Sequence, residues 1–155
     1  MSLRPRIRRS RRTDFPAVMR LLAAAGVPLP PPDRTTLRRF RRLVADLGSD
    51  LYLAVLDDAA AGLVHVSYTR QLAHAPTARI ESLLVDPARR RQGIGSVLLA
   101  FADRRARRRG CASLCWSLGT EDRASRRFAE HAGLLHTEVG VTRRLTPGGD
   151  DDASE

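Results

Sequence analysis

The first third of the chain contains two stretches in which apolar residues recur every three or four positions, the spacing of one face of a helix. They span about 13–26 and about 33–48, and each runs from a capping residue to a glycine. The apolar face of the second helix is predicted to comprise Leu37, Phe40, Val44 and Leu47. We expect a short strand at 6–10. The proline-rich segment 27–32 should be a stiff loop, because proline cannot donate a backbone hydrogen bond.

The spacing then changes to that of strands. Residues 51–56 and 63–69 are predicted to form a hairpin around Asp57 and Asp58, and residues 79–85 to form a third strand. Each of these runs is rich in β-branched or other apolar residues and is bounded by polar or turn-forming ones. This part of the chain therefore predicts antiparallel strands that follow one another in space.

Helical spacing returns at 95–109. Four arginines of this helix are expected to face outward: Arg104, Arg105, Arg107 and Arg108. A strand is predicted at 111–118, a short helix at 121–131 and a last strand at 134–145. The order is therefore β-α-α-β-β-β-α-β-α-β without an internal repeat, which predicts a mixed α/β fold whose central sheet is flanked by helices.

The length of 155 residues suits one domain with a single core. We expect this domain to span 1–146 and the acidic segment 147–155 to be a disordered tail. Hydrophobic residues make up 43% and charged residues 28%, the balance of a soluble globular protein. No apolar run approaches the roughly 20 residues that span a bilayer, and no signal-peptide pattern is recognisable. The sequence therefore predicts a soluble cytoplasmic protein without a membrane partner.

The formal net charge is +10, and all 27 basic residues are arginine. Lysine and asparagine are absent and isoleucine is scarce. These residue types have A/T-rich codons, so the composition indicates a GC-rich bacterial genome, and codon usage accounts for part of the arginine excess. For this reason the charge gives little support to a nucleic-acid partner.

Several kinds of chemistry are excluded by missing residues. A P-loop and a pyridoxal enzyme each need a lysine, and the chain has none.

Cys111 and Cys115 lie four apart in the apolar run of a predicted strand, and we expect them to be buried free thiols. The four histidines are scattered, at His65, His74, His131 and His136. The sequence therefore predicts no metal site.

The most informative segment is 85–96, VDPARRRQGIGS, which lies between a predicted strand and a predicted helix. Backbone N–H groups at such a turn converge on one point, and the helix dipole adds positive potential, so the segment favours a phosphate or pyrophosphate. Gly93 and Gly95 would let that ligand approach the backbone closely. Leu98 stands where a dinucleotide fingerprint needs its third glycine. The alternative is a loop that only caps the helix.

The pattern V-x-P-x-x-R-x-x-G-x-G-x-x-L-L resembles motif A of the GNAT superfamily of acyl-CoA-dependent N-acyltransferases. Arg90, Gly93 and Gly95 fill its signature, (Q/R)-x-x-G-x-(G/A). Segments near both ends of the chain also resemble the family, so the similarity covers roughly residues 4–145. It implies an N-acetyltransferase that moves an acetyl group from acetyl-CoA, its co-substrate, to an amine of a small molecule or peptide by direct attack.

The resemblance also implies roles for individual residues. The backbone of Leu83, Leu84 and Val85 would pair with the pantetheine arm, and an N–H near Leu83 or Leu84 would polarise the thioester carbonyl. The phosphates would be bound by Arg90, Arg91, Gln92, Gly93, Ile94, Gly95 and Ser96, with Arg90 or a neighbouring arginine at the 3′-phosphate. Glu81 stands where the family often has the base that takes the proton of the amine. The alternative is a glutamate that is solvated or paired with Arg79.

The chain departs from the family at Ala129, where a tyrosine often protonates the leaving thiolate. An acyl-CoA-binding sensor without turnover therefore stays open. So does a basic nucleic-acid-binding module, which rests only on arginine clusters without interleaved aromatics. Tyr52, Tyr68 and Trp116 are expected in the core or in a pocket wall. The identity of the amine acceptor, the preferred acyl group and the formation of a homodimer stay open.

Overall fold

The computed structural model describes residues 4–119 and 121–135. These ranges belong to two compact units, 1–119 and 120–155. The elements of the first unit are β1 (Arg6–Arg9), α1 (Phe15–Ala24), α2 (Arg34–Ala45), β2 (Ser49–Leu56), β3 (Ala59–Thr69), β4 (Thr77–Val85), α3 (Ile94–Arg108) and β5 (Ser113–Trp116). The second unit contains α4 (Arg123–His131). Residues 136–145 of the predicted last strand, and the predicted tail 147–155, lie outside the described residues.

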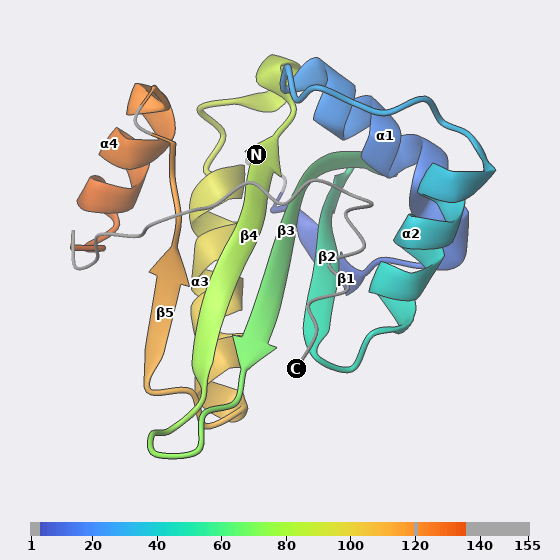
Figure 1. The fold of residues 1–155 in the computed structure, drawn as a ribbon. Helices are drawn as coiled ribbons and strands as arrows, with labels where there is room; N and C mark the ends of the chain where they lie inside the picture. Colours follow the sequence, from blue (N-terminus) through green and yellow to red (C-terminus); the bar gives the residue numbers. More distant parts are fainter. Residues whose placement is uncertain (1–3, 120, 136–155) are drawn as a thin grey trace, which may run out of the picture. The chain divides into compact units, whose positions relative to one another are not determined.

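Five strands form one sheet in the order β1-β2-β3-β4-β5 (Figure 1). The first four pair antiparallel, whereas β4 and β5 pair parallel, with α3 as the connection between them. The mixed α/β class and the order of elements as far as α4 are therefore confirmed.

The β2–β3 hairpin turns at the two aspartates expected from the sequence. Asp57 and Asp58 both have positive φ, at 50° and 58°. A two-residue turn with this geometry matches the right-handed twist of its strands, and aspartate is one of the few residue types that tolerate it.

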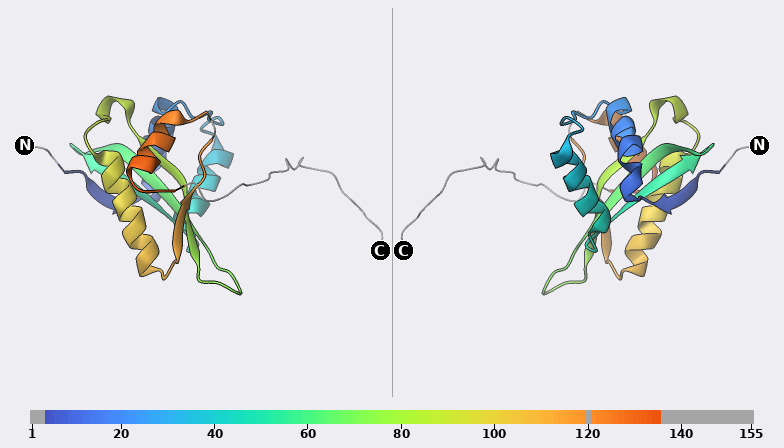
Figure 2. Two further views of the ribbon diagram at one scale, coloured as in Figure 1. Left: turned by 90° about the vertical axis from the view of Figure 1, so that its left-hand side faces the viewer. Right: turned by 90° about the vertical axis from the view of Figure 1, so that its right-hand side faces the viewer.

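Helices cover both faces of the sheet, as the two side views show (Figure 2). On one face α1 and α2 pack on alternate residues of β2 and β3, and the buried cluster there includes Leu21, Phe40, Leu53 and Leu63. On the other face lies α3, whose Leu98 is fully buried. This alternation follows from the two-residue period of a strand, which sends neighbouring side chains to opposite faces.

The predicted second helix begins as expected but ends earlier. The Asp33 carboxylate accepts a hydrogen bond from the Thr36 N–H at 2.9 Å, which caps α2. The helix ends at Ala45, so Leu47 lies beyond it and is 82% exposed. Its assignment to the apolar face was wrong, because the helical spacing continues in the sequence past the point where the backbone turns into β2.

A buried carboxylate joins β2 to β3 and α3. Asp50 has no exposed side-chain surface, and its Oδ2 accepts hydrogen bonds from the Tyr68 hydroxyl at 2.8 Å and from Arg105 Nη2 at 3.1 Å. Arg109 lies 3.4 Å and Arg9 3.7 Å from the same carboxylate. The prediction that Arg105 faces outward was therefore wrong. Burial, followed by the hydrogen bond to Asp50, holds the pKa of Tyr68 well above its usual range.

The two cysteines are free, but they differ from the expectation in place and exposure. Only Cys115 lies in β5, since that strand begins at Ser113, and both cysteines are half-buried. Burial raises the pKa of the Cys111 thiol, which disfavours its reactive thiolate.

We predict that Asp50→Asn destabilises the protein by about 2 kcal/mol, a value below the cost of breaking a fully buried ion pair because its arginines can still reach water. Asp103→Asn is the matched control, since Asp103 pairs with Arg107 on the surface of α3 at 2.8 Å. That change should cost no more than about 0.5 kcal/mol. Urea denaturation of both variants measures the difference, and equal losses would contradict the structural role assigned to Asp50.

Candidate functional site

One edge of β4 changes partner halfway along the strand. Its parallel pairing with β5 runs from Thr77 to Ile80, where Ile80 lies opposite Trp116. The strand itself continues to Val85 and stays paired with β3 on its other edge. Among the described residues, no strand pairs with the second edge of segment 81–85. Its backbone groups on that edge are therefore available to a ligand.

The register shows which backbone groups face this free edge. Val85 lies opposite Gly62, and the N–H of Asp86 donates to the carbonyl of Ala61 at 2.9 Å. In an antiparallel ladder this places the N–H and C=O of Leu84 toward β3 and those of Leu83 and Val85 toward the free edge. Of the two amides predicted near a thioester, only that of Leu83 points away from β3.

A β-bulge at Glu81 interrupts the regular alternation of β4 residues between the two edges of the strand. His65 lies opposite Ser82 and Val66 opposite Ile80, so Glu81 is the extra residue on β4. Its Oε1 accepts a hydrogen bond from the Ser67 hydroxyl at 2.5 Å, and the residue is exposed. Pairing with Arg79 is not observed; that arginine donates to Ser117 instead. The carboxylate thus lies on the solvent-accessible surface, two residues before the free amide of Leu83.

His65 lies opposite Ser82, next to the bulge that carries Glu81. Its sequence position alone did not identify it as a candidate site residue. Burial lowers its pKa, while the charges of Glu81 and Asp46 oppose that shift. Its Nε2 is buried and makes no hydrogen bond within the described residues. A neutral imidazole with a free nitrogen therefore lies beside the carboxylate. The sequence feature that could have identified it is its position two residues after Leu63 in the predicted strand, which places both side chains on the same face of the sheet.

The segment after β4 forms the turn that its motif predicts. Asp86 Oδ1 accepts from the N–H of Ala88 at 2.9 Å, and Arg89 pairs with Asp57 at 2.9 Å. Arg91 and Gly93 both have positive φ, at 63° and 76°. A residue with a Cβ pays about 1–2 kcal/mol for this conformation, so Arg91 is held in place by its surroundings.

This turn leaves a row of backbone N–H groups without partners. The first hydrogen bond into α3 is donated by the N–H of Val97 to the carbonyl of Gly93, at 3.1 Å. Among the described residues, the N–H groups of 91–96 donate no backbone hydrogen bond. A positive φ at two positions beside a helix N-terminus makes a concave donor set, which suits an anion. Arg90 and Arg91 are exposed and form no ion pair in the described part of the chain.

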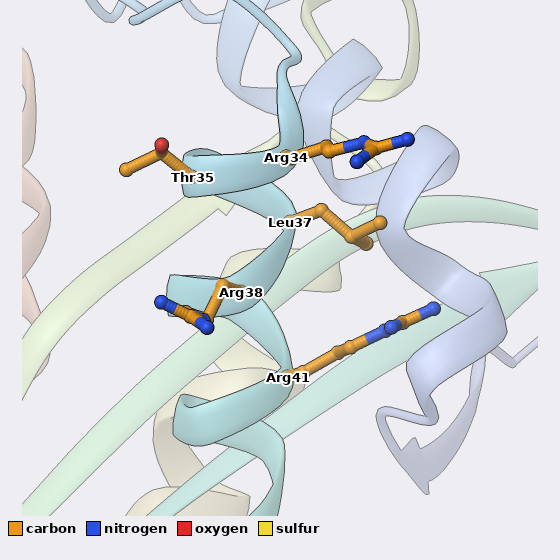
Figure 3. Close-up of a pocket in the computed structure, with 5 residues that line it drawn as sticks. All are labelled: Arg34, Thr35, Leu37, Arg38 and Arg41. Carbon is orange, nitrogen blue, oxygen red and sulfur yellow. The ribbon is translucent and has the colours of Figure 1, made fainter.

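A cavity of about 400 Å³ lies on the α1 and α2 face of the sheet. Its walls come from both helices and the loop after α1, and its floor includes His65 and Ser82. Ser82 stands between Glu81 and Leu83, so this cavity adjoins the carboxylate and the free edge. A hollow of about 540 Å³ on α2 is lined by Arg34, Thr35, Leu37, Arg38 and Arg41 (Figure 3). It contains none of the predicted site residues and no acid or nucleophile suited to acyl transfer.

The sequence matches the acetyltransferase (GNAT) family over residues 6–134. The chain belongs to this family. The family and its fold were thus correctly predicted from motif A, and the chain is an acetyltransferase of the GNAT type. None of the curated proteins matches the sequence significantly.

Solved structures share the fold of this GNAT acetyltransferase. A transcriptional regulator from Bacillus halodurans C-125 is 25% identical, with a TM-score of 0.82 over 91% of this chain and 99% of that one. An aminoglycoside antibiotic 6′-N-acetyltransferase from Acinetobacter baumannii is 19% identical, with a TM-score of 0.78 over 92% and 99%. AAC(6′)-Iy, solved with the bisubstrate analogue CoA-S-monomethyl-acetylneamine, is 21% identical, with a TM-score of 0.77 over 91% and 97%.

The second unit of this GNAT acetyltransferase contains the position that departs from the family. Ala129 lies in α4, whose N-terminus is capped by Asp122, since Asp122 Oδ1 accepts from the N–H of Ser125 at 3.0 Å. Residues 4–119 and 121–135 contain no group of three or more residues arranged to hold a metal ion. No helix within those ranges is long and apolar enough to cross a bilayer.

We predict that His65 titrates below the usual histidine pKa of about 6.5 and that Glu81→Gln lowers its pKa further, because the carboxylate favours the charged ring. The unfolded chain then binds more protons than the folded one. His65 therefore costs stability as pH falls through about 6.5, and this loss is complete below its folded pKa. NMR titration of the imidazole checks both points; a pKa above 7 would contradict the burial of this side chain.

Proposed function

We propose that this protein transfers an acetyl group from acetyl-CoA to an amine of a small molecule or peptide by direct attack. The observation that carries the proposal is the free edge of β4, which leads into a turn of unpartnered N–H groups at the start of α3. An elongated ligand with amides at one end and phosphates at the other matches this sequence of donors. Coenzyme A has that build.

Each part of the donor has a candidate partner. The pantetheine amides pair with the free-edge backbone groups of Leu83 and Val85, as an added strand would. The pyrophosphate takes the N–H groups of 91–96, the segment Arg91, Gln92, Gly93, Ile94, Gly95 and Ser96. Arg90 and Arg91 are the arginines left for the 3′-phosphate, because Arg89 is engaged by Asp57. AAC(6′)-Iy has been solved with a CoA-containing analogue, which supports a CoA donor in this fold.

The reaction then needs a base and a polarised carbonyl. A protonated amine loses one proton to the Glu81 carboxylate, directly or through water, since a primary amine is mostly charged at neutral pH. Its nitrogen forms a bond to the acetyl carbonyl carbon, while the N–H of Leu83 stabilises the charge on the oxygen. The carbon–sulfur bond breaks, the sulfur leaves as a thiolate with the bonding electrons, and the nitrogen gives its second proton to water as the amide forms. One proton returned from water converts the thiolate to the free thiol, and the proton held by Glu81 is released to solvent.

No tyrosine of the first unit is placed to act as the acid. Tyr68 donates its hydroxyl to Asp50 on the α3 side of the sheet, and Tyr52 packs against Phe101 of α3 with ring centroids 4.5 Å apart. A thiol with a pKa near 8.5 is a tolerable leaving group without a proton donor. Water therefore suffices as the proton source in this proposal.

We predict that CoA raises the melting temperature, by mass action on the folded state. Gly93→Ala should abolish this shift, because its methyl group would enter the open space in front of the turn. Gly110→Ala is the matched control, since Gly110 has a similar φ of 72° and equally open surroundings at the other end of α3. Both variants should lose about 1 kcal/mol of stability from backbone strain. Equal CoA shifts in the two variants would show that the phosphate turn is assigned wrongly.

We predict that Glu81→Gln lowers turnover at least tenfold and leaves CoA affinity unchanged, since a lost general base typically costs about 10²–10⁴ in rate. Glu121→Gln makes the same change at an exposed position of the second unit. Thiol release from acetyl-CoA measures turnover. A Glu81 variant as active as the Glu121 control would assign Glu81 to substrate contact or to structure.

A further inference from the structure

The cavity beside Glu81 is built from apolar side chains. Ten of its fourteen lining residues are apolar, and the remaining four are Thr36, Arg39, His65 and Ser82. None of the fourteen is acidic. Its volume of about 400 Å³ falls within the range of small-molecule sites. The lining residues stabilise an apolar occupant and give no counter-ion to a charged one, whereas the carboxylates of Glu81 and Asp46 act on the His65 end of the cavity.

The polar part of the cavity is confined to one end. His65 and Ser82 lie opposite each other on β3 and β4, at the bulge that carries Glu81. The buried Nε2 of His65 makes no hydrogen bond within the described residues, so it can bind one polar group of an occupant. The chemistry proposed for the site needs one amine at this end, and the rest of the occupant then faces the apolar walls.

The helix that forms one wall is strongly positive. Five exposed arginines lie on α2: Arg34, Arg38, Arg39, Arg41 and Arg42. The helix itself carries no acidic residue, and the pKa of Asp33, which caps the helix, is lowered first by the hydrogen bond from the Thr36 N–H and also by the charge of Arg39. No ion pair between any of the five and another described residue is observed. Figure 3 shows Arg34 and Arg41 projecting on the same side of α2 as Leu37. Arg39 itself lines the cavity.

We infer that the acceptor is a monoamine whose nitrogen is borne on an aromatic or branched aliphatic group that fills this cavity, and that polycationic amines are excluded. The inference rests on the proposed acetyl transfer and adds the class of acceptor. A second ammonium group would lose its hydration among apolar side chains without gaining a carboxylate. The arginines of α2 would also repel a polycation, as would the net charge of +10 at longer range.

An amine panel tests the specificity. Phenethylamine is the apolar monoamine, and spermidine and kanamycin are the polycations. With acetyl-CoA and the full chain, kcat/KM for phenethylamine should exceed that for either polycation at least tenfold, the ratio expected when one partner leaves a charge unpaired. Equal or higher kcat/KM for spermidine or kanamycin overturns the inference.

A pair of charge variants in one loop tests the cavity itself. Leu29 lines it, whereas Val27, two residues earlier in the same loop, does not and is 36% exposed. Leu29→Asp should lower kcat/KM for phenethylamine at least tenfold, and Val27→Asp no more than about twofold, because only the first places an unpaired carboxylate against the apolar group. Leu29→Ala, which keeps the cavity neutral, should give a smaller loss than Leu29→Asp. Equal losses at 27 and 29 overturn the assignment of the cavity.

Binding measurements separate this inference from the proposed function. If CoA raises the melting temperature and acetyl-CoA is consumed, but with polycations preferred, the transfer reaction stands and the inference fails. If neither CoA binding nor turnover is found, the proposed function fails. In that case the melting temperature with phenethylamine alone tests whether the cavity binds an apolar monoamine. A rise that is lost in Leu29→Asp but retained in Val27→Asp supports the cavity as the binding site. No rise in the unmodified protein overturns it.

Discussion

The site depends on one constraint: among the described strands, segment 81–85 of β4 has a hydrogen-bonding partner on one edge only. Unpaired donors and acceptors on a strand are costly when buried and invite another chain when exposed. Here the backbone groups of successive residues point to opposite edges. The N–H and C=O groups of Leu83 and Val85 face the free edge, while those of Leu84 are hydrogen-bonded to β3. The same strand is thus held firmly by the sheet and yet keeps backbone groups for a ligand. A loop with the same sequence would lack that fixed spacing.

The turn proposed to bind the phosphates has its position because α3 packs closely on the end of this strand. Gly62 lies opposite Val85, and a Cβ at Gly62 would stand 2.8 Å from the carbonyl oxygen of Leu84 and 3.1 Å from side-chain atoms of Ile94 and Leu98. Only glycine allows this approach. At its other end α3 is fixed by Arg105 and Arg109, whose charges meet the buried carboxylate of Asp50. One helix is therefore anchored at both ends against the sheet, and its free N–H groups stay at the end of β4.

The sequence predicted the order of elements and the turn because both follow from local rules: apolar spacing, capping residues and a strand–glycine–helix pattern. It failed where a distant residue decides the outcome. Arg105 has the position of a surface arginine in the helical pattern, yet Asp50, fifty-five residues away, draws it inward. Glu81 was singled out from the family resemblance and its role stays a prediction, whereas its neighbour His65 was not singled out, because a bulge in a pairing register has no simple sequence signature. The apolar cavity likewise forms only when α1, α2, the loop between them and strands β2, β3 and β4 come together, so its lining residues cannot be recognised from local sequence.

The sequence predicts that codon usage accounts for part of the arginine excess, but the arginines differ in what they contact. Some arginines are matched by carboxylates, as Arg8 is by Asp14 at 2.7 Å and Arg89 by Asp57 at 2.9 Å. Those of α2 form no ion pair in the described part of the chain; Arg39 lines the apolar cavity, whereas Arg34, Arg38 and Arg41 line the separate hollow on α2. An excess of arginine that came from codon usage alone could lie on any exposed face of the protein. Given the acceptor inferred above, the arginines of α2 would also disfavour a highly charged amine near the cavity that adjoins Glu81. On the proposed function, the donor and acceptor sites therefore share one sign of charge, which attracts the phosphates of CoA and repels polycations.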